Sequence, residues 1–191
     1  MQTIHQAFQL LSRGQVEYAA NLSAQLLSDA PGHARVHYLA CEVAIARNQV
    51  ARALQHINRA IEIDGQEPEL RFKKAQVEII QRQGLKAQST ASTTAALHPD
   101  NPSIQLHAAK IFSQCDNHAG AEAFLLQARA LQADSPEFLF EFAKNQFYLG
   151  KTLEAEQAIS DYLDLRLPTN GPLLFLRARL QKQTRAHNHV R

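Results

Sequence analysis

Tryptophan is absent from this chain of 191 residues, and cysteine, glycine and proline are scarce. The two cysteines, Cys41 and Cys115, are too few and too far apart in sequence for a disulfide framework, so a reducing compartment is the simpler expectation. Seven glycines and seven prolines, beside abundant Ala, Leu, Gln, Glu and Arg, favour helix over strand. We therefore expect an all-α protein, and its 45% of hydrophobic residues is enough to bury a core.

Long apolar runs are also missing. No segment approaches the roughly 18 apolar residues that a membrane span requires. The stretch from Met1 to Gly14 lacks the basic start, apolar run and small-residue cleavage site of an export signal. We expect a soluble, cytoplasmic chain that does not bind membranes.

A repeat with a strict interval of 34 residues runs along the chain. Two of its columns hold small residues, and two others hold prolines and turn-forming residues. The small columns are Ala7, Cys41, Ala75, Ala109, Ala143 and Ala19, Ala53, Ala87, Ala121, Ala155; the others are Pro68, Pro102, Pro136 and Gly14, Asn48, Arg82, Asp116, Gly150. Four columns that share one period indicate a repeated structural unit.

Each column has a physical reason to exist if the unit is a pair of antiparallel helices. A small residue in each helix lets the two backbones approach closely. Proline suits the first turn of a helix, where its missing N–H has no partner anyway. Gly14, Asn48 and Gly150 fall where a helix must end in a left-handed residue, which Gly and Asn tolerate best.

Apolar residues between these markers recur at helical spacing, as in Val50, Ala53, Leu54, Ile57 and Ile61. We predict first helices near 2–12, 34–46, 68–81, 102–114 and 136–148, second helices near 16–28, 50–62, 85–96, 118–131 and 152–164, and a closing helix over 172–185. The predicted organisation is a single array over 1–185, with repeats at about 1–33, 34–67, 68–101, 102–135 and 136–169, a capping helix at 171–185 and a frayed tail at 186–191.

The 34-residue unit resembles the tetratricopeptide repeat. The resemblance rests on residues 14–19 (Gly-Gln-Val-Glu-Tyr-Ala) and 48–53 (Asn-Gln-Val-Ala-Arg-Ala), and it extends to about residue 167. Repeat three departs from the family pattern with Arg82 at the turn and Gly84 at a usually aromatic position, so its turn geometry is open. The resemblance implies a right-handed superhelical solenoid of five repeats plus a capping helix. It also implies a non-catalytic scaffold whose concave face, lined by the first helices, binds proteins or peptides.

Carried onto the first helices residue by residue, the resemblance implies a concave face that is apolar and aromatic with few charges. An exposed surface of this kind marks a partner site, although half-buried helix packing is the alternative for any one residue. The expected partner-binding residues are Phe8, Tyr38, Glu42, Phe72, Gln76, Ile79, Lys110, Phe140, Lys144 and Tyr148. The positions that hold a peptide carboxylate in chaperone-binding family members are occupied here by Ile4, Phe8, Leu39, Glu69 and Lys73, so that clamp is absent.

One group of metal-ligating residues shares a predicted helix face. His33, His37 and Cys41 are spaced four residues apart, as zinc ligands on a helix would be. Cys41 belongs to a small packing column, however, and His37 lies where the family places a large core side chain. We therefore predict no metal site and no cofactor.

Charge is uneven along the chain. After Asp164 there are six Lys or Arg residues and no acidic residue, so the net charge of +2 divides into +6 for that end and −4 for the rest. A solvated cationic face explains this better than nucleic-acid binding, so we do not expect a nucleic acid as a partner. No Ser/His/Asp or Cys/His grouping lies on a distinctive motif, so an enzyme is not expected.

Two alternatives to a free-standing scaffold remain open. The segment 176–191 is similar to the junction at which bacterial repeat arrays lead into a sulfotransferase domain, so the chain could be the recognition segment of a larger enzyme, truncated here. The groove or an exposed helix face could instead pair with a second copy, which would make the chain a homo-oligomerisation module or homodimer.

Overall fold

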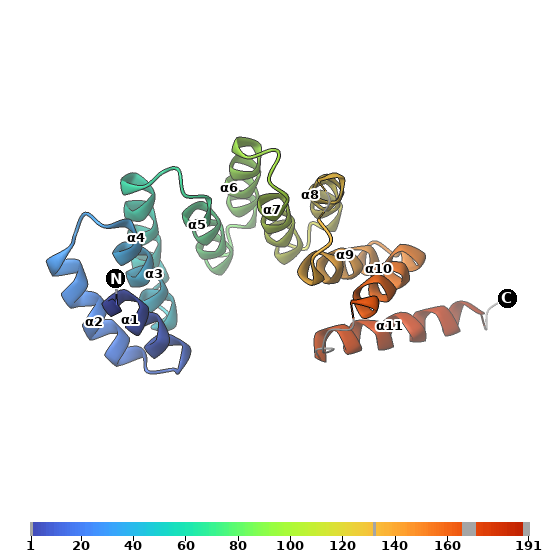
Figure 1. Cartoon of the computed structure of the whole chain (residues 1–191), viewed down its shortest axis with the longest axis horizontal. Coiled ribbons are helices and arrows are strands. Elements are labelled where there is room, and N and C mark those ends of the chain that lie inside the picture. Colours follow the sequence, from blue (N-terminus) through green and yellow to red (C-terminus); the bar gives the residue numbers. More distant parts are fainter. Residues whose placement is uncertain (1, 132, 166–170, 189–191) are drawn as a thin grey trace. The chain divides into compact units, whose positions relative to one another are not determined.

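The computed structural model describes residues 2–131, 133–165 and 171–188, and within these ranges all regular structure is α-helical (Figure 1). The predicted all-α fold is therefore confirmed. The helices are α1 (Gln2–Ser12), α2 (Val16–Asp29), α3 (Ala34–Ala46), α4 (Val50–Ile63), α5 (Pro68–Ile80), α6 (Gly84–Leu97), α7 (Pro102–Gln114), α8 (His118–Ala130), α9 (Pro136–Tyr148), α10 (Thr152–Asp164) and α11 (Gly171–Asn188). In this described part, no helix is both long and apolar enough to cross a lipid bilayer.

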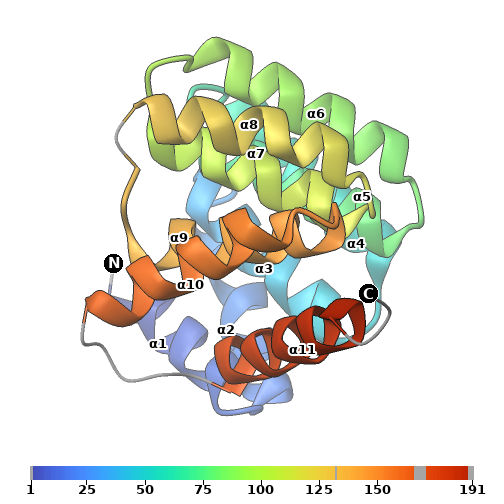
Figure 2. The same cartoon turned by 90° about the vertical axis from the view of Figure 1, so that its right-hand side faces the viewer.

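Successive helices pack as hairpins. α1 packs with α2, α3 with α4, α7 with α8, and α9 with α10, while α11 packs against α9 and α10 (Figure 2). The contacts divide the chain into two compact units, residues 1–94 and residues 95–191, and α6 begins in the first unit and ends in the second.

The five hairpin turns share one backbone geometry. Gly14, Asn48, Arg82, Asp116 and Gly150 all have positive φ, between 57° and 74°. After each of them, the next N–H bonds to a carbonyl five residues back, as in Gln15 to Leu10 (2.9 Å) and Gln83 to Glu78 (2.8 Å). This 6→1 bond is the mark of a Schellman helix end. Arg82 therefore adopts the same turn as the glycines, in spite of its Cβ.

The starts of three helices, α5, α7 and α9, also follow from the sequence. Pro68, Pro102 and Pro136 each occupy the first turn of a helix, as their column predicts. Two of these starts also carry a side-chain cap. The Asn101 side chain accepts from the N–H groups of Ser103 and Ile104, and the Ser135 hydroxyl accepts from the N–H of Phe138 at 3.1 Å.

The small residues of both columns lie in the core. All ten have at most 1% of their surface exposed. In the unit of residues 1–94, Cys41, Ala53, Ile57 and Val77 belong to one buried cluster, and Ala7, Ala19 and Leu39 to another. The hairpins therefore close over small side chains, as the 34-residue period requires.

In the unit of residues 95–191 one core joins α7 to α11. Leu173, Leu176 and Leu180 of α11 are buried in it beside α9 and α10 residues. Leu174, by contrast, is 48% exposed. It follows Leu173 directly, and one residue rotates a helix by about 100°, which turns Leu174 away from the core. α11 reaches Asn188, and the remainder of the predicted tail lies outside the described residues.

Gly120 marks the tightest approach within that unit. A Cβ at this position would lie 2.4 Å from the Cδ1 atom of Phe112, whose ring packs on that of Phe124 at a centroid distance of 5.0 Å. The absence of a side chain at Gly120 therefore lets α8 lie against the Phe112 ring of α7.

Candidate partner-binding surface

An aromatic pair lies on the first helices of the unit formed by residues 1–94. Phe8 on α1 and Tyr38 on α3 have ring centroids 6.0 Å apart at an interplanar angle of 51°. Both side chains are half-buried, so each ring packs on the protein and also presents surface to solvent. Tilted aromatic pairs at this distance are favourable and have little freedom to move. The pair forms a preorganised apolar patch.

An ion pair borders this patch. Lys73 on α5 lies 2.5 Å from a carboxylate oxygen of Glu42 on α3, and its Nζ is 5.6 Å from the centroid of the Tyr38 ring. The Lys73 and Glu42 side chains are only 16% and 25% exposed, respectively. Partial burial reduces solvent screening of the pair, and the ammonium gains a further cation–π attraction to Tyr38. Side chains of α3 and α5 are thereby held together.

The Tyr38 hydroxyl is directed at carboxylates. Burial raises its pKa well above the ordinary value of 10.0, and the charges of Glu42 and Glu69, together with hydrogen bonds to both, raise it further. The hydroxyl is thus protonated at all physiological pH values and acts as a donor. We call Phe8, Tyr38, Glu42, Glu69 and Lys73 together the Tyr38 surface.

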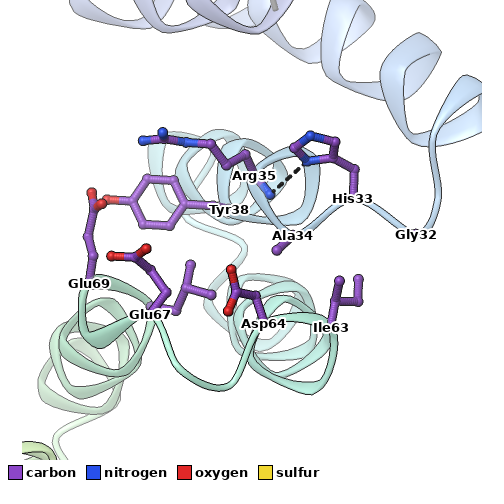
Figure 3. A pocket seen from close by; sticks show the side chains of 10 residues that line it. Gly32, His33, Ala34, Arg35, Tyr38, Ile63, Asp64, Glu67 and Glu69 are labelled. Carbon is purple, nitrogen blue, oxygen red and sulfur yellow. Dashed lines mark hydrogen bonds between the residues drawn. The ribbon is translucent and has the colours of Figure 1, made fainter.

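A pocket of about 530 Å³ opens beside Tyr38, within the same unit. Ala34, Ile63 and Leu70 supply apolar lining, and Asp64, Glu67, Glu69 and Arg35 supply charge; Gly32, His33 and Tyr38 complete the set. Figure 3 shows the Tyr38 hydroxyl directed toward Glu69, with the Glu67 and Asp64 carboxylates on the other side of the opening. The volume is in the range of pockets that take small ligands or side chains.

The unit of residues 95–191 has a smaller polar surface on its first helices. Lys110 on α7 lies 2.6 Å from Glu137 on α9, and its hydrogen bond lowers the pKa of that carboxyl group. Lys144 pairs with Glu141 one turn away, and its Nζ is 5.8 Å from the centroid of the Phe140 ring. These pairs leave the two lysines neutralised within the protein.

Tyr148, at the end of α9, has a contact that its sequence position did not predict. Its ring stacks on His118 of α8 at a centroid distance of 4.4 Å and an angle of 4°, while 53% of its surface stays exposed. The stacking fixes the orientation of an exposed aromatic ring.

Not every expected partner-binding residue faces solvent. Phe72 is only 5% exposed and is part of the interior. It lies one residue before Lys73, so the two side chains diverge, and Lys73 rather than Phe72 joins Tyr38. Gln76 and Ile79, further along α5, are half-buried. The structure thus brings together Phe8, Tyr38 and Glu42 from the expected set.

Sequence reasoning missed Glu67, Asp64 and Arg35 and considered Lys73 and Glu69 only as clamp positions that do not match. Glu67 and Asp64 fall in the connection between two predicted helices, where spacing does not fix side-chain direction. A search for acidic residues around the start of each first helix would have found Glu67 and Glu69, because both flank Pro68.

His33, His37 and Cys41, which share the spacing of zinc ligands, have separate structural roles. His33 caps the helix by accepting from the N–H of Arg35 at 3.2 Å. His37 lies 2.9 Å from the carbonyl of Pro31 through Nε2 and 3.4 Å from His56 through Nδ1. Cys41 is fully buried, and burial raises the pKa of its thiol to about 12. The thiol is therefore protonated and belongs to the core.

Stacked helix hairpins with a surface of aromatic and charged residues along the first helices define a class, the helical-repeat proteins. A sequence model of the tetratricopeptide repeat matches residues 10–77. The match covers parts of the first three repeats, and over most of its length the chain shares its fold with tetratricopeptide repeat proteins of known structure. No curated protein matches it in sequence.

Solved structures share the fold over almost the whole chain. A structure of PilF from Pseudomonas aeruginosa is 18% identical, with 97% of this chain and 84% of that chain covered and a TM-score of 0.73. A thermophilic tetratricopeptide repeat protein of Thermus thermophilus is 19% identical, covering 95% and 96%, with a TM-score of 0.71. YrrB, a tetratricopeptide repeat protein with an unusual peptide-binding site, is 14% identical, covering 92% and 90%, with a TM-score of 0.61. Identities this low establish the fold alone.

Proposed function

We propose that this protein is a non-catalytic scaffold that binds a peptide or an extended segment of another protein along the first helices of its repeats. The observation that carries the proposal is the Tyr38 surface, on which a preorganised aromatic pair and an ion pair lie beside an open pocket. Aromatic anchors with restrained rotamers beside polar groups are typical of interaction hot spots. The peptide-binding site of YrrB, a protein with the same fold, gives the proposal independent support.

Panning a random dodecapeptide phage library on the full chain tests this proposal. Recovered peptides are synthesised with a fluorophore, and their affinity is measured by fluorescence anisotropy for the wild type and for Tyr38→Ala. Loss of an aromatic anchor typically costs about 2 kcal/mol or more, so we expect affinity to fall by about thirtyfold. The Tyr38→Ala variant must retain the helical circular dichroism of the wild type.

Tyr18 supplies the matched control. It lies on α2, a second helix of a hairpin, and is 69% exposed. Tyr18→Ala removes an equal amount of aromatic surface away from the proposed site, so it should leave peptide affinity unchanged. Recovery of no peptide, or equal loss of affinity in both variants, would refute the proposed site.

A further inference from the structure

The pocket beside Tyr38 carries negative charge that the protein itself does not neutralise. Three carboxylates and one guanidinium line it, namely Asp64, Glu67, Glu69 and Arg35. Among the residues that the structure describes, none of the three carboxylates has a cation within ion-pair distance. Tyr38 donates a hydrogen bond to one of them, Glu69, and a hydroxyl donor leaves the charge of that carboxylate in place. The pocket therefore attracts a positive charge.

Helix electrostatics account for only part of this charge. Glu67 and Glu69 lie at the start of α5, where the positive end of the helix dipole favours an anion. Asp64 follows the last residue of α4, where the carbonyl groups at the negative end of the dipole repel a carboxylate. Asp64 thus lowers the stability of its own helix, and a bound cation would offset that repulsion.

The apolar part of the pocket suits a long, flexible cationic side chain. Ala34, Ile63 and Leu70 can contact methylene groups, while the carboxylates stand at the opening (Figure 3). Lys and Arg side chains bury their alkyl stems in this way and keep their charged ends near polar groups. Figure 3 shows the guanidinium of Arg35 beyond the Tyr38 ring, on the side away from Asp64. The space between Asp64 and Glu67 thus has no cation of its own.

An anionic ligand fits the same surface poorly. The ammonium of Lys73 is already paired with Glu42 and lies against the Tyr38 ring. A peptide carboxylate placed here would meet Glu42, Glu67 and Glu69, with Arg35 as the one cation left to receive it. Repulsion between like charges would select against it.

We propose that this pocket holds a Lys or Arg side chain of a bound peptide, with a neighbouring apolar residue of the peptide on the Phe8–Tyr38 pair. This inference deepens the proposed function and rests on it. The charged end lies between Asp64 and Glu67, its stem contacts Leu70 and Ile63, and the peptide runs along α3 toward α1.

The peptides recovered from the dodecapeptide library serve as probes for the test, again with the full chain. We expect Lys or Arg to be enriched beside an apolar residue. Replacing that Lys or Arg with norleucine, which keeps the alkyl stem without the charge, should weaken binding by about tenfold. The protein variant Asp64→Asn with Glu67→Gln should lose a similar factor for the basic peptide and little for its norleucine analogue.

Glu62→Gln is the control for the loss of one carboxylate. Glu62 lies on α4, two residues before Asp64. It does not line the pocket, and it pairs with Arg59 on the surface. It should leave affinity unchanged. Raising the salt concentration should weaken the binding of basic peptides more than that of their norleucine analogues, because salt screens the charge of the Lys or Arg side chain.

The outcomes separate the two proposals. Peptides that need Tyr38 but carry no Lys or Arg, or that bind the Asp64→Asn, Glu67→Gln variant as tightly as the wild type, would overturn this inference and leave the scaffold intact. Recovery of no Tyr38-dependent peptide would overturn both.

Discussion

Replacement of Arg82 by glycine should stabilise the protein. Arg82 has φ of 60°, in the left-handed region, and ends α5 with the same hydrogen bonds that Gly14 and Gly150 make at their turns. Its side chain is exposed, and in the described structure it has no ion pair. The substitution therefore removes backbone strain and little else.

The size of the effect follows from two opposing terms. A Cβ in the left-handed region costs about 1–2 kcal/mol, which glycine avoids. Glycine in turn gives the unfolded chain more freedom, which opposes folding by about 0.5–1 kcal/mol. We expect a net gain of about 0.5–1 kcal/mol in the free energy of unfolding, or a Tm increase of about 2–4 °C per kcal/mol for a chain of this size.

Thermal and urea denaturation followed by circular dichroism measures this gain. Arg82→Ala is the matched control, because it removes the guanidinium and keeps the Cβ, so the difference between Ala and Gly reports the backbone alone. The converse substitution, Gly150→Ala, should lower stability by about 1 kcal/mol; an added Cβ there meets no atom within 4 Å, so a clash cannot explain the loss. If Arg82→Gly is no more stable than Arg82→Ala, the shared turn geometry is wrong.

Two further predictions concern packing and pH. Gly120→Ala should lower the free energy of unfolding, measured by urea denaturation, by about 1–2 kcal/mol. The Phe112 ring must move to admit the new Cβ, and the cost of this movement outweighs the gain of about 1 kcal/mol in helix propensity. A more stable variant would contradict this packing. Burial, followed by the charges of His37 and Arg52, lowers the pKa of His56 from 6.5, so the unfolded state binds the proton more tightly. The contribution of His56 to stability should then be full above about pH 6.5 and be lost as the pH drops below it. Urea midpoints measured across that range should depend less on pH in His56→Gln than in the wild type. An unchanged slope of midpoint against pH would exclude His56 as the cause of the pH dependence.

The repeat period allowed most of the fold to be predicted. Because each column fixes a helix start, a turn or a close helix contact, the predicted bounds agree with the observed helices to within one or two residues at α1 to α10. Arg82 shows that the turn is predicted by the column as a whole and not by the residue at one position. Read alone, arginine at a left-handed position indicates a different turn, yet the neighbouring helices impose the same one.

The surface was harder to predict because it depends on distances between helices. Tyr38 and Glu42 were identified from their places on the first helix, but the pairing of Glu42 with Lys73 depends on the separation of α3 and α5. Phe72 was expected on the surface because the family resemblance places its position on the concave face. Small rotations of α5 decide whether such a ring faces inward, and Phe72 is buried. Periodicity does not resolve a rotation of that size.

Amide chemical-shift mapping by NMR, with the tightest library peptide titrated into the full chain, tests the central claim most directly. The first helices of residues 1–94 should carry the binding site, so the largest shifts should fall on α1, α3 and the start of α5, around Tyr38. Shifts concentrated on α2 and α4, with residues near Tyr38 unaffected, would contradict it.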